Sequence, residues 1–163
     1  MYCTICGEKL TLMFKQEEGL VPYCKQCAEY RFPHFATAVS MVVTNRTKDK
    51  IFLAKHIGSD DYILFAGYIK KGETAEKAVT REFKEETKLD TVKYKYMGSR
   101  YHEPKEVLML NYLIMAENGE ISLDRNELTE ATWFDPDIAL EIIKKDSVAQ
   151  AFLKNALKEL KKL

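Results

Sequence analysis

The sequence predicts an α+β domain that is preceded by a small metal-bound module, and three observations support this. The chain has 163 residues, 46% of them hydrophobic and 31% charged, which is enough for one domain with a core and a small appendage. Strands are expected before and after one central helix, and further helices close the chain, an order that favours α+β. All four cysteines lie before position 28.

The balance of charge argues against broad electrostatic binding to two classes of partner, nucleic acids and acidic membranes. Because 25 basic side chains face 25 acidic ones, we expect no broad attraction to nucleic acid or acidic membranes. The longest uncharged stretch, Phe35 to Asn45, has about half the length of a bilayer-spanning helix, and the chain begins without the pattern of an export signal. We therefore expect a cytoplasmic protein that binds no membrane and meets any polyanion at a local site.

The cysteines form two pairs, Cys3 with Cys6 and Cys24 with Cys27, separated by 17 residues. This spacing is typical of zinc sites, because each pair offers two thiolates from one tight turn and four sulfurs complete a tetrahedron. A shell of four protein ligands has no position for water, so the zinc would be structural. We predict a zinc ribbon over residues 1–34; disulfides, redox thiols and free cysteines are the alternatives.

The body of the chain, residues 35–163, is expected to form strands around one helix. Apolar and β-branched runs predict strands at 36–44, 51–56, 62–69, 91–98, 107–115 and 131–134. A stretch without glycine or proline predicts the helix over residues 74–88, with Thr74 as its N-cap.

Two helices are expected at the end of the chain. Asp135-Pro136 begins the first, and the second begins at Ser147, which forms a capping box with Gln150. The apolar positions of the last helix recur at helical spacing: Val148, Phe152, Ala156, Leu160 and Leu163.

The helix over residues 74–88 has an unusual distribution of charge. On a helical wheel its lysines gather on one side, whereas Glu82, Glu85 and Glu86 share an arc with small apolar residues. Buried unpaired carboxylates are costly, and like charges at i,i+4 destabilise a helix, so a cation is expected between them. Mg²⁺ or Mn²⁺ fits three carboxylates better than zinc does. An acidic face paired with arginine and lysine is the alternative.

The segment from Gly67 to Leu89, GYIKKGETAEKAVTREFKEETKL, resembles the Nudix box. Its charged and glycine positions match in type and spacing, except that Lys88 stands where the box has a glycine. The chain is therefore identified as similar to the Nudix superfamily. This resemblance implies an α/β/α sandwich with a mixed β-sheet that hydrolyses a nucleoside diphosphate linked to another moiety.

The resemblance also implies a role for each matching residue. Glu82 and Glu86 would be the principal metal ligands, and Glu85 a further ligand or the water-activating group. Arg81 and Glu73 would orient these carboxylates. Bridging metal ions would neutralise the diphosphate oxygens and lower the pKa of the attacking water.

Two further metal contacts are implied outside the box. Ala66, just before it, would offer its carbonyl oxygen. Glu127 best matches a late metal-binding glutamate of the family and Glu130 is second, with an exposed loop residue as the alternative for Glu127.

A zinc ribbon ahead of a Nudix domain is similar to the NADH pyrophosphatase group, some of whose members remove NAD caps from RNA and many of whose relatives form homodimers. The group carries a serine-glutamine-proline-tryptophan-proline-phenylalanine-proline stretch after the box, and residues 99–109 match it only at its two ends. Phe32 stands where a substrate-contacting tyrosine is usual. Candidate substrates are therefore NAD(H), NAD-capped RNA, ADP-ribose, sugar nucleotides and nucleoside triphosphates. Arg100, Tyr101 and His102 either contact the substrate or form an ordinary polar loop.

Two functions from different classes follow. One is a metal-dependent pyrophosphohydrolase, and the other is a non-catalytic ligand sensor or nucleic-acid-binding module that uses the zinc ribbon. Retention of all three glutamates of the box favours the enzyme.

Overall fold

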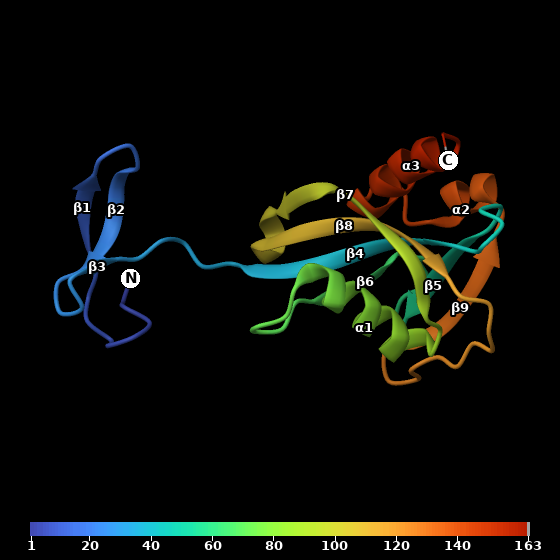
Figure 1. Ribbon diagram of the computed structural model, residues 1–163, viewed down its shortest axis with the longest axis horizontal. Helices are drawn as coiled ribbons and strands as arrows, with labels where there is room; N and C mark the ends of the chain where they lie inside the picture. The colour runs from blue at the N-terminus through green and yellow to red at the C-terminus, as the bar shows by residue number, and fades with distance from the viewer. Residues whose placement is uncertain (163) are drawn as a thin grey trace. The chain divides into compact units, whose positions relative to one another are not determined.

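The computed structural model describes residues 1–162, so the expected apolar position Leu163 lies outside the described residues. The chain divides into two compact units, Met1–Phe35 (the N-terminal unit) and Ala36–Leu163 (the C-terminal unit). The elements of both units are labelled in Figure 1. None of the helices within residues 1–162 has the length and apolar character needed to cross a bilayer.

The N-terminal unit is a three-stranded antiparallel sheet in the order β1-β2-β3, formed by Thr11–Lys15, Gly19–Cys24 and Glu29–Tyr30. The residue after each cysteine pair adopts a left-handed conformation, with φ of 78° at Gly7 and 54° at Ala28. In this fully described unit the buried apolar side chains are Cys3, Val21 and Cys24. So small a core needs a second source of stability.

The C-terminal unit contains one mixed sheet in the order β7-β8-β4-β5-β9, with β6 paired to β4. β4 and β8 are parallel, and the other pairs are antiparallel. The strands are β4 (Ala36–Thr44), β5 (Ile51–His56), β6 (Phe65–Tyr68), β7 (Thr91–His102), β8 (Val107–Ala116) and β9 (Leu128–Phe134).

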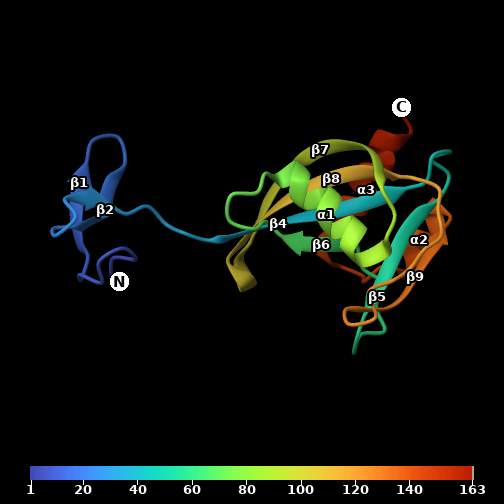
Figure 2. The ribbon, with the colours of Figure 1, turned by 60° about the horizontal axis from the view of Figure 1, so that its bottom comes forward.

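Helices cover both faces of this sheet, as Figure 2 shows. Val39, Met41 and Val43 of β4 belong to a core with α1 (Ala75–Thr87). Val42, between them, belongs to a second core with α2 (Pro136–Ile142) and α3 (Val148–Leu160). Because alternate residues of a strand face opposite sides, β4 is buried on both. The predicted α/β/α sandwich with a mixed sheet is confirmed.

The predicted elements agree with the structure except at some strand ends. β6 begins three residues later than predicted, because Tyr62 and Ile63 form isolated bridges to Ile143 and Ala54. β7 continues past the predicted end at 98 to His102, and its register shifts between residues 96 and 99. β9 begins at residue 128 instead of 131.

Both predicted helix caps are present. The Thr74 hydroxyl accepts a hydrogen bond from the N–H of Lys77 at 3.3 Å. The Ser147 hydroxyl accepts one from the N–H of Gln150 at 3.1 Å, and the Gln150 side chain in turn accepts from the N–H of Asp146. In a standard capping box the side chain at the position of Gln150 accepts from the N–H of the N-cap residue, Ser147, whereas here it accepts from the N–H of the preceding residue.

Lys88, which stands at the glycine position of the Nudix box, adopts a left-handed conformation with φ of 64°. A side chain in this region costs roughly 1–2 kcal/mol, and glycine recovers part of this after its own entropy loss. We expect Lys88→Gly to raise the free energy of unfolding by about 0.5–1 kcal/mol, measured by urea denaturation. Lys77→Gly, in the same helix, is the control and should lower it by about 1 kcal/mol. A destabilised Lys88→Gly variant would contradict this explanation.

Candidate functional site

The glutamates of the 67–89 segment are positioned by the packing of α1. Glu82 and Glu86 lie on the same side of the helix as its buried apolar residues, so their side chains are only slightly exposed, with 15% for Glu82 and 3% for residue Glu86. Glu85 lies further round the helix, and its side chain is 52% exposed. Three apolar residues of α1 are fully buried: Ala78, Val79 and Phe83.

Arg81 connects these carboxylates. Its guanidinium donates two hydrogen bonds of 2.7 Å to Glu73, and its Nη1 donates to Glu82 at 2.6 Å and to Glu85 at 3.0 Å. Nη2 also donates to the carbonyl oxygen of Tyr68 at 3.1 Å. The hydrogen bonds from Arg81 are the main reason that the pKa of Glu73 falls to about 2. Arg81 and Glu73 thus form a fixed, charged support for Glu82 and Glu85.

The position of the Glu82 side chain depends on a glycine at residue 67, because β6 runs close to α1. A Cβ atom on Gly67 would lie 2.0 Å from Cδ of Glu82 and 2.5 Å from its Oε1. The φ of Gly67 is not positive, so the need for glycine comes from this close approach and not from backbone strain. The missing side chain provides the space for the Glu82 carboxylate.

Glu86 is the most buried of these glutamates and has an unfavourable electrostatic environment. Burial, followed by the negative charges of Glu127, Glu82, Asp124 and Glu85, raises its pKa to about 8. No lysine or arginine within residues 1–162 forms an ion pair with it. A buried carboxylate among other carboxylates is costly unless a cation neutralises it. The oxygen donors present here fit a hard divalent cation.

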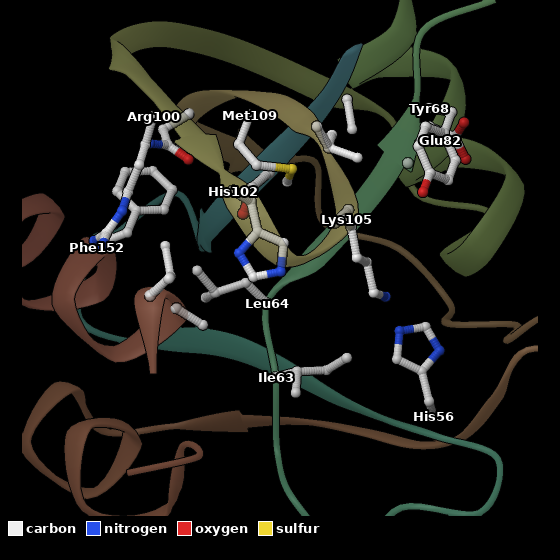
Figure 3. Close-up of a pocket in the computed structure, with 18 of the residues that line it drawn as sticks. His56, Ile63, Leu64, Tyr68, Glu82, Arg100, His102, Lys105, Met109 and Phe152 are labelled. Atoms are coloured by element: carbon white, nitrogen blue, oxygen red, sulfur yellow. The ribbon is translucent and has the colours of Figure 1, made fainter. Parts of the chain in front are cut away.

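A cavity of about 620 Å³ adjoins the carboxylates, within the size range of ligand sites. Figure 3 shows Glu82 and Tyr68 at one end, Arg100 and Phe152 at the other, and His102 between the two ends. Five residues expected in the site line the cavity: Ala66, Glu82, Arg100, His102 and Glu127.

Other expected residues lie elsewhere. Tyr101 does not line the cavity, because it alternates along β7 with Arg100 and His102, which do. Phe32 belongs to the N-terminal unit, where the Nζ of Lys15 lies 4.6 Å from its ring centroid. Glu130 accepts a hydrogen bond from Tyr62 and pairs with a lysine of β5.

Asp124 and His56 belong to the site, although the sequence did not single them out. The charge of Asp124 contributes to the raised pKa of Glu86, and its N–H donates to the Glu86 carbonyl oxygen at 3.0 Å. His56 lines the cavity, with Nδ1 3.3 Å from the carbonyl oxygen of Glu127. His56 ends β5 and Asp124 lies in the loop before β9, and these segments come together only in the folded protein. A signal for Asp124 was its spacing of three residues from Glu127 in one polar turn.

The four cysteines converge in the N-terminal unit. Their Sγ atoms all lie within 4.8 Å of one another, and Cys6 and Cys24 are 3.4 Å apart. Backbone hydrogen bonds, and a hydrogen bond from Arg31, lower the pKa of the Cys3 thiol to about 6 although burial raises it. The neighbouring cysteines, Cys6 first, and burial raise the pKa of Cys27 to about 12. A lowered pKa favours the thiolate that binds a metal. This donor set fits a tetrahedral structural metal ion.

Comparisons with known proteins agree with this geometry. A family model described as NUDIX domain matches residues 34–156. The NAD-capped RNA hydrolase NudC of Photobacterium profundum is 28% identical over 162 residues, which cover 98% of this chain and 59% of that protein. The protein of the same name from Escherichia coli is 31% identical over 138 residues, with 83% and 52% covered. The chain thus spans little more than half the length of these relatives.

Two solved structures illustrate the similarity of fold. The NUDIX hydrolase from Nitrosomonas europaea has a TM-score of 0.67 at 17% identity, and the alignment covers 97% of this chain and 90% of that one. The NUDIX domain of Shewanella oneidensis NrtR, solved in complex with ADP ribose, has a TM-score of 0.66 at 14% identity, covering 85% and 94%.

Proposed function

Because the chain belongs to the Nudix family, we propose that it hydrolyses a diphosphate linkage in a nucleoside diphosphate derivative. The observation that carries this proposal is the buried Glu86, which is surrounded by four carboxylates beside a cavity of nucleotide size. A structural role does not require such an arrangement, because unpaired buried charge destabilises a fold.

We assign the binding of Mg²⁺ or Mn²⁺ to Glu82 and Glu86, with Glu85, Glu127 and the carbonyl oxygen of Ala66 as further donors. The chemistry that the bound cation supplies is neutralisation of the diphosphate oxygens and a lower pKa for the attacking water. Glu127 is favoured over Glu130, because Glu127 lines the cavity and its charge acts on Glu86.

The other residues of the site bind, orient and transfer a proton. Arg81 and Glu73 hold the carboxylates of Glu82 and Glu85 in place. Glu85, which is half exposed, is the group assigned to accept the proton of the attacking water as the water oxygen bonds to phosphorus. The bridging P–O bond breaks, and Lys70 on the cavity wall faces the charge that develops on the leaving phosphate.

NAD(H)-like molecules are the first candidate substrates, and NAD-capped RNA and ADP-ribose are the next. The support is the activity for which the NudC relatives are named and the ADP ribose bound by the NrtR domain. Product analysis after incubation with Mg²⁺ or Mn²⁺, by chromatography and phosphorus NMR, tests the proposal. We expect two phosphomonoester products from one class of substrate. Saturable binding of these nucleotides without any turnover would reject the hydrolase hypothesis in favour of the ligand sensor.

We also infer that the four cysteines hold a structural Zn²⁺ in a ribbon over residues 1–34. Removing the metal with a chelator is expected to unfold the N-terminal unit, because its core is too small to fold alone. Loss of amide protection in this unit, measured by hydrogen exchange, checks the prediction. Fluorescence of Trp133, the single tryptophan, is the control and should not change. Full protection without metal would remove the zinc assignment.

A further inference from the structure

The cavity has a basic wall at the end of β7. Arg100, His102 and Lys105, from β7 and the turn that follows it, all line the cavity. Glu103 and Glu106 lie in the same turn but are not part of the lining. Residues 100–106 contain both basic and acidic side chains, but only the basic ones line the cavity, because of the alternation of side chains along β7 and the path of the turn.

Among residues 1–162, these three basic side chains have no acidic partner. The ion pairs and hydrogen bonds within residues 1–162 leave the Arg100, His102 and Lys105 side chains unpaired. The acidic residues of the cavity lining are Glu82 and Glu127. An unpaired cationic group on a cavity wall attracts an anionic ligand.

Arg100 is separated from the site of hydrolysis. Figure 3 shows Arg100 beside Phe152, at the end of the cavity away from Glu82, with His102 and Lys105 between the ends. A diphosphate that lies at the carboxylates is therefore near Lys105 and Lys70, and it leaves Arg100 facing the nucleoside part of the ligand. The surroundings of Arg100 suit a nucleoside, because apolar side chains lie near it. Phe152 is beside it in Figure 3, Met109 is its partner across β7 and β8, and Val148 lines a neighbouring hollow together with it.

We propose that Arg100 binds a phosphomonoester carried by the nucleoside part of the substrate. The preferred substrate is then a nucleoside diphosphate derivative with an additional phosphate, such as a dinucleotide phosphorylated on its adenosine ribose. A guanidinium suits this role, because its planar fork donates two hydrogen bonds to one phosphate. The inference rests on the proposed function for its reaction, but the binding of the extra phosphate can be measured without hydrolysis.

The first test compares NADPH with NADH, which differ only in the 2′-phosphate. A charge-assisted contact predicts a kcat/KM that is about 10- to 100-fold higher for NADPH. Arg100→Met should remove this preference and change the kcat/KM of NADH less than about threefold, and Arg100→Lys should restore part of the preference. Equal values for the two substrates in the wild type would overturn the proposal.

The second test measures binding of adenosine 2′,5′-bisphosphate and of AMP to the same proteins by calorimetry. We expect the bisphosphate to bind about tenfold or more tightly than AMP, and this difference to vanish in Arg100→Met. Arg100-dependent binding without turnover of any nucleoside diphosphate derivative, dinucleotides and ADP-ribose included, would reject the proposed function and keep this inference. Turnover of NADH with no effect of the 2′-phosphate on binding or rate would keep the proposed function and reject this inference.

A matched control separates a specific contact from general attraction. Lys154 lies with Arg100 at a neighbouring surface hollow but does not line the main cavity. Lys154→Met removes the same charge from the same region and should leave the NADPH preference unchanged. If Arg100→Met and Lys154→Met lost the NADPH preference equally, the preference would come from the overall positive charge of this region, which contradicts the proposal. Arg100 is exposed, so its substitution should leave the fold intact, which circular dichroism checks.

Discussion

Glu86→Gln is expected to abolish hydrolysis and, at the same time, to stabilise the metal-free protein at pH 8. Loss of a principal metal ligand should lower kcat by about 10³-fold or more. The stabilisation arises because the folded protein must otherwise keep a carboxylate buried among four others. The amide of glutamine has a similar shape and no charge, so this repulsion disappears.

The dependence on pH has a definite sign. Burial and neighbouring charges raise the pKa of Glu86 to about 8 from 4.5, so between these values the folded protein binds a proton that the unfolded chain has released. Stability from this group is therefore present below pH 4.5 and is lost as the pH rises towards 8. The variant should exceed the wild type by about 2–4 kcal/mol at pH 8 and by little at pH 4.5.

Urea denaturation at several pH values, without and with Mg²⁺, measures this difference. Added Mg²⁺ should raise the stability of the wild type and leave Glu86→Gln unchanged. Glu85→Gln is the matched control, because Glu85 is half exposed: it should also lose activity but gain little stability. The pKa of Glu73 is lowered in all three proteins, so its contribution to the pH dependence of stability cancels when their free energies of unfolding are compared. Equal stability of the wild type and Glu86→Gln at pH 8 would reject the assignment of Glu86.

The parts of the site that the sequence predicted are those determined by local geometry. Helical periodicity predicted that three glutamates share the apolar side of α1, and this holds for Glu82 and Glu86, whereas Glu85 is half exposed. The hydroxyl of Thr74 marks the start of that helix. The end of α1 was not settled in this way: the sequence showed only that Lys88 stands at the glycine position of the box, and the structure shows that this residue is left-handed.

The far wall of the cavity was not predictable in this way, because it depends on pairing between distant strands. β7 continues to His102 by pairing with β8, and only this extension separates Arg100 and His102 from Tyr101 by face. Asp124 reaches Glu86 through a backbone hydrogen bond across 38 positions of the sequence, the difference between 124 and 86. The extension of β7 leaves no local pattern. The spacing of Asp124 from Glu127 could single out Asp124 but not its contact with Glu86, so both features required the fold.

Gly67→Ala is expected to lower kcat/KM by about 10²-fold without destabilising the fold. The added Cβ would lie 2.0 Å from Cδ of Glu82, so the carboxylate must leave its place beside Arg81. Glu82 is a flexible side chain and can move, and alanine is tolerated at the backbone conformation of residue 67, so we expect a change in stability below about 1 kcal/mol. Displacement of a catalytic group by about 1 Å is enough for the loss of activity.

Steady-state kinetics and thermal unfolding separate these two effects. Gly119→Ala is the matched control: its φ is not positive either, and its added Cβ meets Leu89 at 3.0 Å, in a different part of the chain. This control should keep nearly full activity. A Gly67→Ala protein that is as active as the wild type would mean that the position of Glu82 in the structure is not the one that hydrolysis uses.

A double-mutant cycle identifies the route by which Gly67 acts. If its only effect is to make room for Glu82, then Gly67→Ala should cost nothing further in a Glu82→Ala protein, because the shorter side chain no longer meets the new Cβ. The two losses would then be far from additive, with the double variant as active as Glu82→Ala alone. Additive losses would instead assign Gly67 a separate role, such as the placement of the neighbouring Ala66 carbonyl oxygen.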